Sequence, residues 1–229
     1  MASSPNVPNM RVCAIDVGTN STRYMIADLD RHARRVTVLF QGTQLTRLGA
    51  GIGSTNKIQP EHAAKTLEAV QKYYTYALSL SVSDFRIFGT AVLREAANGE
   101  VFRGEVAAFT GVPVTVIDGK HEARLTEMAI AHSLGLEDKP FYGLDIGGGS
   151  AQLLHHVPGA DASYASLPLG AVRLTEKYLK SDPPTQAELQ SLREHARNTL
   201  GAKPSPASCP LVCVGGTANG ECGKGGMTC

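Results

Sequence analysis

The sequence contains no tryptophan, and its aromatic residues make up only 6% of 229 residues. Proteins that bind single-stranded nucleic acid stack the bases on aromatic rings, and few such rings are available here. The 22 basic and 21 acidic residues leave a formal net charge of +1. A near-neutral chain has no general electrostatic attraction for nucleic acid or for an anionic membrane surface. The composition therefore predicts neither nucleic acid nor a membrane as a partner.

Long apolar runs are absent as well. No stretch approaches the roughly 20 apolar residues that cross a bilayer, and the first ten residues, MASSPNVPNM, lack the apolar core of a secretion signal. A cytoplasmic location is therefore predicted. The five cysteines form no C-x-x-C pair, and no histidine follows them at the spacing of a zinc site. We interpret them as reduced thiols.

What the chain does contain is an alternation of strand and helix patterns, which is typical of an α/β fold. The helix at 98–111 has Asn98 as its expected cap and Gly111 as its stop. The pattern predicts further helices at 59–80, 119–135, 170–180 and 184–200, and strands at 11–17, 22–29, 142–146, 150–156, 162–168 and 210–214, with three more beginning near Arg35, Phe85 and Val112.

The same order of elements starts again near the middle, so two lobes are predicted. A flexible segment, 1–10, precedes the first α/β lobe at 11–125, and the second lobe occupies 126–217. The helix that contains Glu122 bridges them. The glycine-rich tail at 218–229 is a poor helix former, so we expect it to be disordered and the second lobe to be incomplete.

One motif occurs twice, once in each predicted lobe. It stands in CAIDVGTNSTRYMIADLD near the start and in YGLDIGGGSAQLLHH in the middle. A single glycine-rich turn is most often a plain tight turn. Here, however, three positions recur at one constant offset along the chain, namely Asp16, Gly18 and Ser21 as Asp145, Gly147 and Ser150. The repeat favours a shared chemical purpose.

Phosphate binding is the purpose that these residue types suit. A turn without side chains lets its backbone N–H groups point at an anion, and a serine at its end adds a hydroxyl donor. The preceding aspartate can hold Mg²⁺ directly or through water, although either aspartate could instead cap its own turn. Two such hairpins facing one another would grip a phosphate chain from both sides.

These motifs resemble the phosphate loops of the actin/Hsp70/sugar-kinase superfamily. Within it, the chain resembles the exopolyphosphatase/guanosine pentaphosphate phosphohydrolase (Ppx/GppA) family in six blocks that run in order from about residue 11 to 217. The blocks are AIDVGTNSTRYMIADL, FGTAVLREAANGEVF, IDGKHEARL, LDIGGGSAQL, SLPLGAVRLTE and VGGT. The resemblance implies a two-lobed actin-like ATPase (ribonuclease H-like) fold with mixed sheets flanked by helices.

The resemblance also implies an activity and the residues that perform it. It implies Mg²⁺-assisted release of terminal orthophosphate from inorganic polyphosphate or guanosine pentaphosphate, and it allows a homodimer. Glu122 would be the catalytic base, since a phosphoanhydride is hydrolysed by a positioned water that loses a proton. Asp16 and Asp145 would hold the metal. The implied phosphate contacts are Gly18, Asn20, Ser21, Arg94, Gly147, Gly148, Gly149 and Ser150.

Simpler roles compete with some of these assignments. Glu122 would also suit the positive end of a helix dipole, and Arg94 would also suit a solvated surface. Arg173 is ambiguous, because a pair with Glu176 on one helix face, or plain exposure, would equally explain it.

Two positions depart from the family pattern. Gln152 stands where the family's GGGSTE block ends in glutamate, so Mg²⁺ affinity or water activation should be weaker here. His121 stands in the block IDGKHEARL, where the family pattern E-E-A-R-L has its first acidic residue. A weakly active protein that binds polyphosphate or an alarmone is therefore an alternative, and an ATP-dependent small-molecule kinase is a more distant one. The sequence does not decide between polyphosphate and guanosine pentaphosphate.

Overall fold

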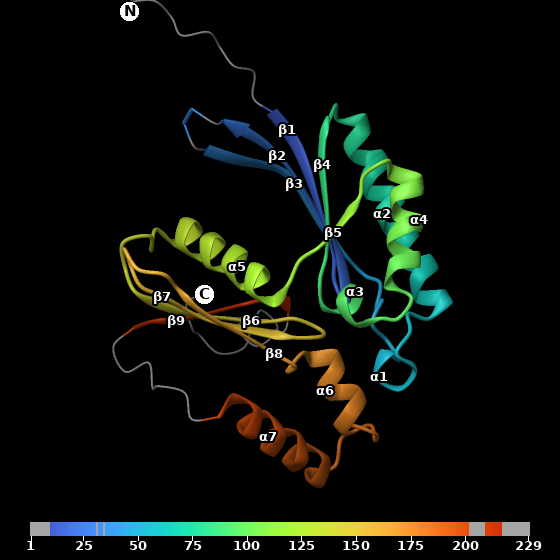
Figure 1. Ribbon diagram of the computed structural model, residues 1–229, viewed down its shortest axis with the longest axis vertical. Helices are drawn as coiled ribbons and strands as arrows, with labels where there is room; N and C mark the ends of the chain where they lie inside the picture. The colour runs from blue at the N-terminus through green and yellow to red at the C-terminus, as the bar shows by residue number, and fades with distance from the viewer. Residues whose placement is uncertain (1–9, 31, 34, 202–208, 217–229) are drawn as a thin grey trace, which may run out of the picture.

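The computed structural model describes residues 10–30, 32–33, 35–201 and 209–216 of the chain. These residues form two lobes, each built around its own sheet (Figure 1). The predictions for the segment before residue 10, for Thr217 and for the tail at 218–229 lie outside the described residues. None of the described helices combines the length and the apolar character that a bilayer crossing requires.

The first lobe contains a five-stranded mixed sheet in the order β3-β2-β1-β4-β5. β1 pairs antiparallel with β2 and parallel with β4, so the sheet changes direction at β1. Its strands are β1 Met10–Val17, β2 Ser21–Asp30, β3 Arg35–Leu45, β4 Asp84–Gly89 and β5 Val114–Val116.

Two helices, α2 Pro60–Ser79 and α4 Gly99–Thr110, cover one face of this sheet (Figure 1). Two short helices, α1 Ile52–Thr55 and α3 Ala91–Glu95, lie toward the lower end of the sheet in the same view. The alternation of β1 sends Cys13, Ile15 and Val17 into the first core, where all three are fully buried. The helical spacing of α2 brings Ala69 and Val70 to the same core. The position of this core therefore follows from the two-residue alternation of β1 and the helical period of α2.

Of the two residues predicted to end α4, Gly111 acts as expected, whereas Asn98 has the expected position but not the expected hydrogen bond. Gly111 ends the helix with a φ of 69°, the left-handed conformation in which glycine is favoured. Asn98 precedes the helix, but its side chain makes no cap hydrogen bond. Instead its amide exchanges two hydrogen bonds with the backbone of Ile58, at 2.8 and 3.0 Å. The expected cap therefore ties α4 to the loop before α2, because that loop offers both a donor and an acceptor.

The second lobe contains a four-stranded sheet in the order β8-β7-β6-β9. β6 pairs antiparallel with β7 and parallel with β9, which repeats the arrangement around β1. The elements are β6 Phe141–Ile146, β7 Ala151–His156, β8 Ser163–Leu167 and β9 Leu211–Val214, with helices α6 Ala171–Tyr178 and α7 Gln186–Leu200. The pattern of the sequence predicted all six, and only their ends differ.

Helix α5, Gly119–Leu134, connects the lobes. Asp118 caps it by accepting a hydrogen bond from the N–H of His121 at 2.7 Å, and Gly135 ends it in the left-handed conformation. The helix lies along the second sheet, on the side that faces the first lobe (Figure 1). The predicted lobe boundary between residues 125 and 126 falls inside this helix.

A cluster of three polar side chains fastens α5 to the second sheet. The ring of His156 on β7 donates from Nδ1 to the Glu127 carboxylate at 2.6 Å and from Nε2 to the Glu137 carbonyl at 3.1 Å. The Tyr164 hydroxyl donates to the same carboxylate. Burial opposes the charge of His156, but the bonds to Glu127 and Glu137 outweigh it and raise the pKa of the imidazole above its ordinary value.

The charged form of His156 should therefore stabilise the fold in a pH-dependent way. Because the folded pKa is raised, this contribution is present below pH 6.5 and is lost as the pH rises through the folded value. We expect His156→Gln to lower the free energy of unfolding more at pH 6 than at pH 9, measured by urea denaturation. His155→Gln is the control, because His155 stacks on Tyr142 instead. An equal loss at both pH values would contradict the charged cluster.

Candidate active site

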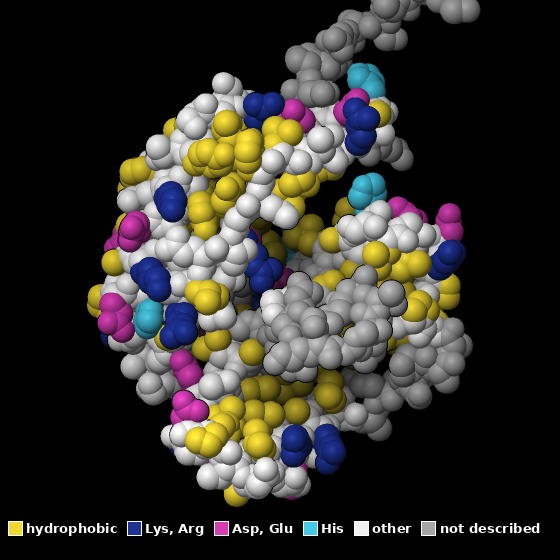
Figure 2. Space-filling view, turned by 180° about the vertical axis from the view of Figure 1, so that it is seen from behind, with side chains coloured by type: hydrophobic (Ala, Val, Ile, Leu, Met, Phe, Trp, Pro, Cys, Tyr) yellow, Lys and Arg dark blue, Asp and Glu magenta, His cyan; other side chains and the backbone are white. Residues whose placement is uncertain are grey.

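A cleft of about 310 Å³ lies where the two lobes meet, and both lobes line it. Figure 2 shows the surface hollowed between the lobes. The lining contains both glycine-rich hairpin turns and the first turn of α5. The sequence-predicted residues among its walls are Asp16, Gly18, Asn20, Ser21, Glu122, Asp145, Gly147, Gly148, Gly149 and Ser150.

The first phosphate loop, Val17–Ser21, is held from behind by the loop after β3. The N–H of Gly18 closes the turn on the carbonyl of Ser21 at 3.0 Å. The carbonyls of Thr19 and Asn20 accept hydrogen bonds from the N–H groups of Gly49 and Arg47, both at 2.9 Å. Since a trans peptide is planar, fixing a carbonyl on one side aims the next N–H to the other side. The N–H of Asn20 therefore faces away from these donors and bonds to no other group in the described residues.

The second phosphate loop, Gly147–Ser150, is built in the same way with a different support. The N–H of Gly147 closes the turn on the carbonyl of Ser150 at 3.0 Å. The carbonyls of Gly147 and Gly148 accept hydrogen bonds at 2.9 Å from the first two N–H groups of α6. The N–H groups of Gly148 and Gly149 are thereby turned the other way, and they bond to no other group in the part of the chain described. Such free N–H groups in a row attract anions.

Glycines are needed here because backbones approach closely, rather than because of left-handed conformations. A Cβ at Gly148 would lie 3.1 Å from the Cβ atoms of Thr19 and Asn20, so the two phosphate loops contact each other. A Cβ at Gly170 would lie 2.3 Å from the carbonyl oxygen of Gly148 and from the carbonyl carbon of Gly149. Gly170 therefore permits α6 to begin directly beneath the second loop.

Three carboxylates share the cleft, and burial raises the pKa of each. Desolvation raises the pKa of Asp16 and of Asp145, with Arg23 acting in the opposite sense on both. For Glu122, desolvation outweighs the attraction of Arg94, and the charges of Asp145 and Asp16 add to it, so its pKa is raised to about 7. A carboxyl group with this pKa can take up and release a proton near neutral pH.

Two arginines lie beside these carboxylates. Arg23, on β2, is the cross-strand neighbour of Asp16, so the two side chains share one face of the sheet. Arg94 is turned toward the first turn of α5: its Nη1 donates to the carbonyl of Ile117 at 2.6 Å and to Oε2 of Glu122 at 3.3 Å. Arg94 does not line the cleft directly, and its other donors have no partner among the described residues.

Gln152 occupies the position in the second lobe that Arg23 occupies in the first, because it is the cross-strand neighbour of Asp145. Its side chain is only 1% exposed and does not line the cleft. Its amide nitrogen donates to the hydroxyl of Ser150 at 2.9 Å. Gln152 therefore reaches the cleft through Ser150.

No three Asp, Glu, His or Cys side chains of the described residues gather closely enough to hold a metal by themselves. Mg²⁺ usually binds through one or two carboxylates while phosphate oxygens and waters complete its shell. Asp16 and Asp145 face one cleft and interact electrostatically, so they suit such a shared site.

Sequence reasoning missed two residues around the site, Arg23 and Thr126, and left the role of Arg173 undecided. Arg23 could have been found, because strand alternation places it on the face of Ser21. Thr126, on the second turn of α5, donates from its hydroxyl to Oδ2 of Asp145 at 3.2 Å. The sequence indicated this residue only by its position one helical turn after Glu122. The sequence left Arg173 ambiguous between a pair with Glu176, plain exposure and a functional role. Its side chain bonds to Gly149 and to Glu95, beside the second cavity.

Comparison with known proteins agrees with this architecture. A model of the Ppx/GppA phosphatase family matches residues 25–219. Exopolyphosphatase 2 of Mycobacterium tuberculosis is 35% identical over 208 residues, which cover 88% of this chain and 64% of that relative. Exopolyphosphatase 1 of Mycobacterium leprae is 32% identical over 186 residues, which cover 81% of this chain and 54% of that relative. The chain thus spans less than two thirds of the length of these curated relatives.

Solved structures show the same fold. The Ppx/GppA enzyme of Aquifex aeolicus matches with a TM-score of 0.72 at 30% identity, over 92% of this chain and 69% of that one. An exopolyphosphatase-like protein matches with a TM-score of 0.80 at 27% identity, over 91% of this chain and 67% of that one. The predicted family resemblance and the predicted α/β fold with two mixed sheets flanked by helices are both confirmed.

The close approach at Gly170 generates a testable expectation. In Gly170→Ala the new methyl group would press against the backbone of the second loop, so α6 or the loop must shift, at a cost of about 1–3 kcal/mol of stability. We expect weaker binding of inorganic tripolyphosphate by calorimetry, by about tenfold, which corresponds to about 1.4 kcal/mol. Gly104→Ala is the matched control, since a Cβ there meets nothing within 4 Å. Unchanged stability and affinity in Gly170→Ala would show that this contact does not shape the loop.

Proposed function

The chain belongs to the Ppx/GppA phosphatase family, and from that premise we propose that it releases terminal orthophosphate from inorganic polyphosphate or guanosine pentaphosphate. One observation carries the proposal: Glu122, with a pKa of about 7, stands in the same cleft as two loops whose free N–H groups suit phosphate oxygens. The names of the relatives at 32–35% identity support polyphosphate as the substrate.

In this proposal, phosphate is bound by N–H and hydroxyl donors that already face the cleft. The N–H groups of Asn20, Gly148 and Gly149, with the hydroxyls of Ser21 and Ser150, offer neutral donors to the phosphate oxygens. Because the peptides that carry these N–H groups are held through their carbonyls, the N–H groups need little reorganisation when the anion arrives. Arg94 would add charge through the guanidinium donors that it does not use for Glu122 and Ile117.

Glu122 acts as the general base in this proposal. Phosphoryl transfer needs a water in line with the leaving oxygen, and a carboxylate within reach can orient that water and accept its proton. Asp118 caps the helix turn that carries Glu122, and Arg94 contacts Oε2 of its side chain. Its Oε1 makes no hydrogen bond in the described residues and is the atom that we assign to the water.

Mg²⁺ is the cofactor that the donor set suits. Asp16 and Asp145 would hold it, and when bound it would neutralise charge on the phosphate chain. The charge of Arg23 acts to lower the pKa of both aspartates and so favours the ionised form that a metal requires.

The central experiment compares the wild type with Glu122→Gln. Phosphate release from polyphosphate, guanosine pentaphosphate and ATP is measured with Mg²⁺ present. We expect the variant to lose about 100-fold or more of the activity, while inorganic tripolyphosphate still binds. Glu105→Gln, the same change at an exposed position on α4, is the control. Binding without phosphate release by the wild type would favour a sensor, and transfer from ATP to a small molecule would favour a kinase.

The same enzyme assay has a pH dependence that follows from the pKa of Glu122. The base must be ionised, so kcat/KM of the wild type should fall about tenfold per pH unit below pH 7 and level off above it. A profile that is flat between about pH 5.5 and 7 would count against Glu122 as the base.

Gln152 allows a second test. Glu at this position would place a negative charge behind the Ser150 hydroxyl, one hydroxyl away from the cleft, which should strengthen Mg²⁺ binding. We therefore expect Gln152→Glu to raise turnover and to lower the Mg²⁺ concentration that gives half-maximal rate. Unchanged turnover with unchanged Mg²⁺ dependence would refute this role of position 152.

A further inference from the structure

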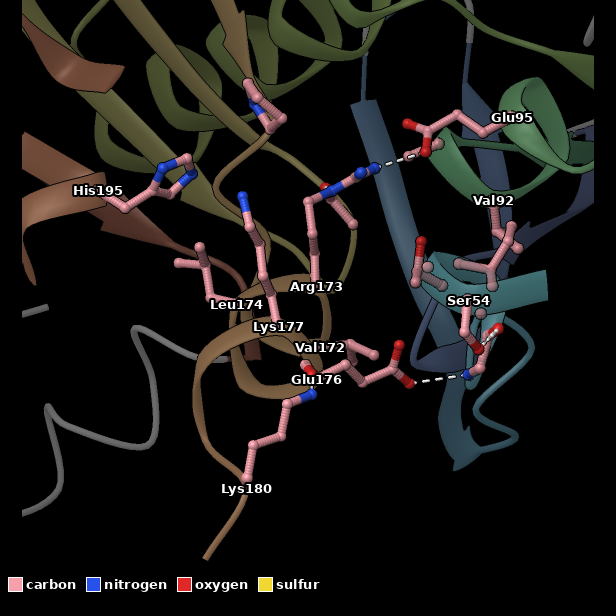
Figure 3. Close-up of a pocket in the computed structure, with 18 residues that line it drawn as sticks. Ser54, Val92, Glu95, Val172, Arg173, Leu174, Glu176, Lys177, Lys180 and His195 are labelled. Atoms are coloured by element: carbon pink, nitrogen blue, oxygen red, sulfur yellow. Dashed lines mark hydrogen bonds and ion pairs between the residues drawn. The ribbon is translucent and has the colours of Figure 1, made fainter. Parts of the chain in front are cut away.

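Helix α6 belongs to the second lobe but reaches the first lobe at two points. Arg173 donates from Nη2 to Oε2 of Glu95, on α3, at 2.5 Å. One turn later, Oε1 of Glu176 accepts a hydrogen bond from the N–H of Gly51 at 2.8 Å. Figure 3 shows both contacts extending from α6 across a second cavity of about 660 Å³, which shares Thr19 and Gly149 with the walls of the first.

Arg173 makes a second side-chain contact, which is not part of the link between the lobes. Its Nε donates to the carbonyl of Gly149 at 2.8 Å. The carbonyls of Gly147 and Gly148 are bound by N–H groups of α6, and Arg173 supplies the donor that the helix backbone does not. All three glycine carbonyls of the loop are therefore held by α6.

The carbonyl of Gly149 belongs to the same planar peptide as the N–H of Ser150. Holding that carbonyl from behind therefore aims the N–H of Ser150 into the cleft. Nη2 of the same guanidinium binds Glu95. One rigid group thus joins the last peptide of the second loop to the lobe that carries the first loop.

We propose that Arg173 is a positioning residue: it sets the direction of the Ser150 N–H and ties that direction to the closed arrangement of the lobes. The proposal deepens the proposed function and rests on it for its catalytic consequence. Arg173 itself does not line the cleft in which Glu122 lies, so it acts through Gly149.

A plain surface ion pair would not explain this arrangement. The Arg173 and Glu95 side chains are 35% and 43% exposed, and pairs of this kind contribute little by themselves. The bond to Gly149 is separate from the pair and uses a different nitrogen. Lysine has a single donor nitrogen, so it cannot reproduce the two nitrogens, Nε and Nη2, that a planar guanidinium holds at fixed positions.

The test compares three alanine variants. Arg173→Ala removes both of its side-chain contacts, Glu95→Ala removes only the contact of Arg173 with the first lobe, and Lys177→Ala is the control. Lys177 lies on the same helix and contacts the Tyr178 ring. Arg173→Lys serves as the conservative variant. The measurements are the amide chemical shift of Ser150 in the ligand-free protein, the Kd for inorganic tripolyphosphate with Mg²⁺, and kcat and KM for phosphate release.

We expect Arg173→Ala to shift the Ser150 amide signal and to raise the Kd about tenfold or more, because a hydrogen bond from a charged group is lost. Arg173→Lys should recover at most part of this loss. Glu95→Ala should raise the Kd by no more than about fivefold, and Lys177→Ala should change nothing. Arg173→Ala combined with Glu95→Ala should be no worse than Arg173→Ala alone.

Two results would overturn the proposal. One is an Arg173→Ala protein whose melting temperature falls while the Ser150 signal and the Kd stay unchanged, since the residue would then be merely structural. The other is a loss in Glu95→Ala equal to that in Arg173→Ala. If the wild type released no phosphate, the proposed function would fail, but the chemical shift of Ser150 would still decide the role of Arg173.

Discussion

Both halves of the cleft depend on backbone carbonyls that are bound from behind. In the first loop, Arg47 and Gly49 bind the carbonyls of Asn20 and Thr19, and in the second, α6 binds those of its glycines. A planar peptide then leaves the adjoining N–H groups facing the opposite way. The direction of the free N–H groups is therefore set by segments outside the two loops, which explains why the bare glycine motif is a weak signal by itself.

The charges in the cleft are arranged around this neutral row of donors. Burial raises the pKa of Asp16, Asp145 and Glu122, while the charge of Arg23 opposes the rise at both aspartates. Arg23 thus limits the rise at the two aspartates, whereas the pKa of Glu122 reaches about 7. The three carboxyl groups of one cleft thus differ in their electrostatic surroundings because they have different charged neighbours.

The sequence was sufficient for features that local patterns encode. Strand alternation located the first core, and the offset repeat of Asp16 and Asp145 located both hairpins of the cleft. Contacts between distant segments were beyond its reach. Arg94 turns to Ile117, and Arg173 crosses to Glu95, because of where other elements end in space. The short helices α1 and α3 were also missed, since four or five residues carry no measurable period.

The two hairpins are alike in backbone but not in charge. Opposite its aspartate, the first carries a guanidinium at Arg23, whereas the second carries the buried, neutral amide of Gln152. An otherwise symmetric clamp thus has an electrical polarity across its gap, directed from one lobe to the other.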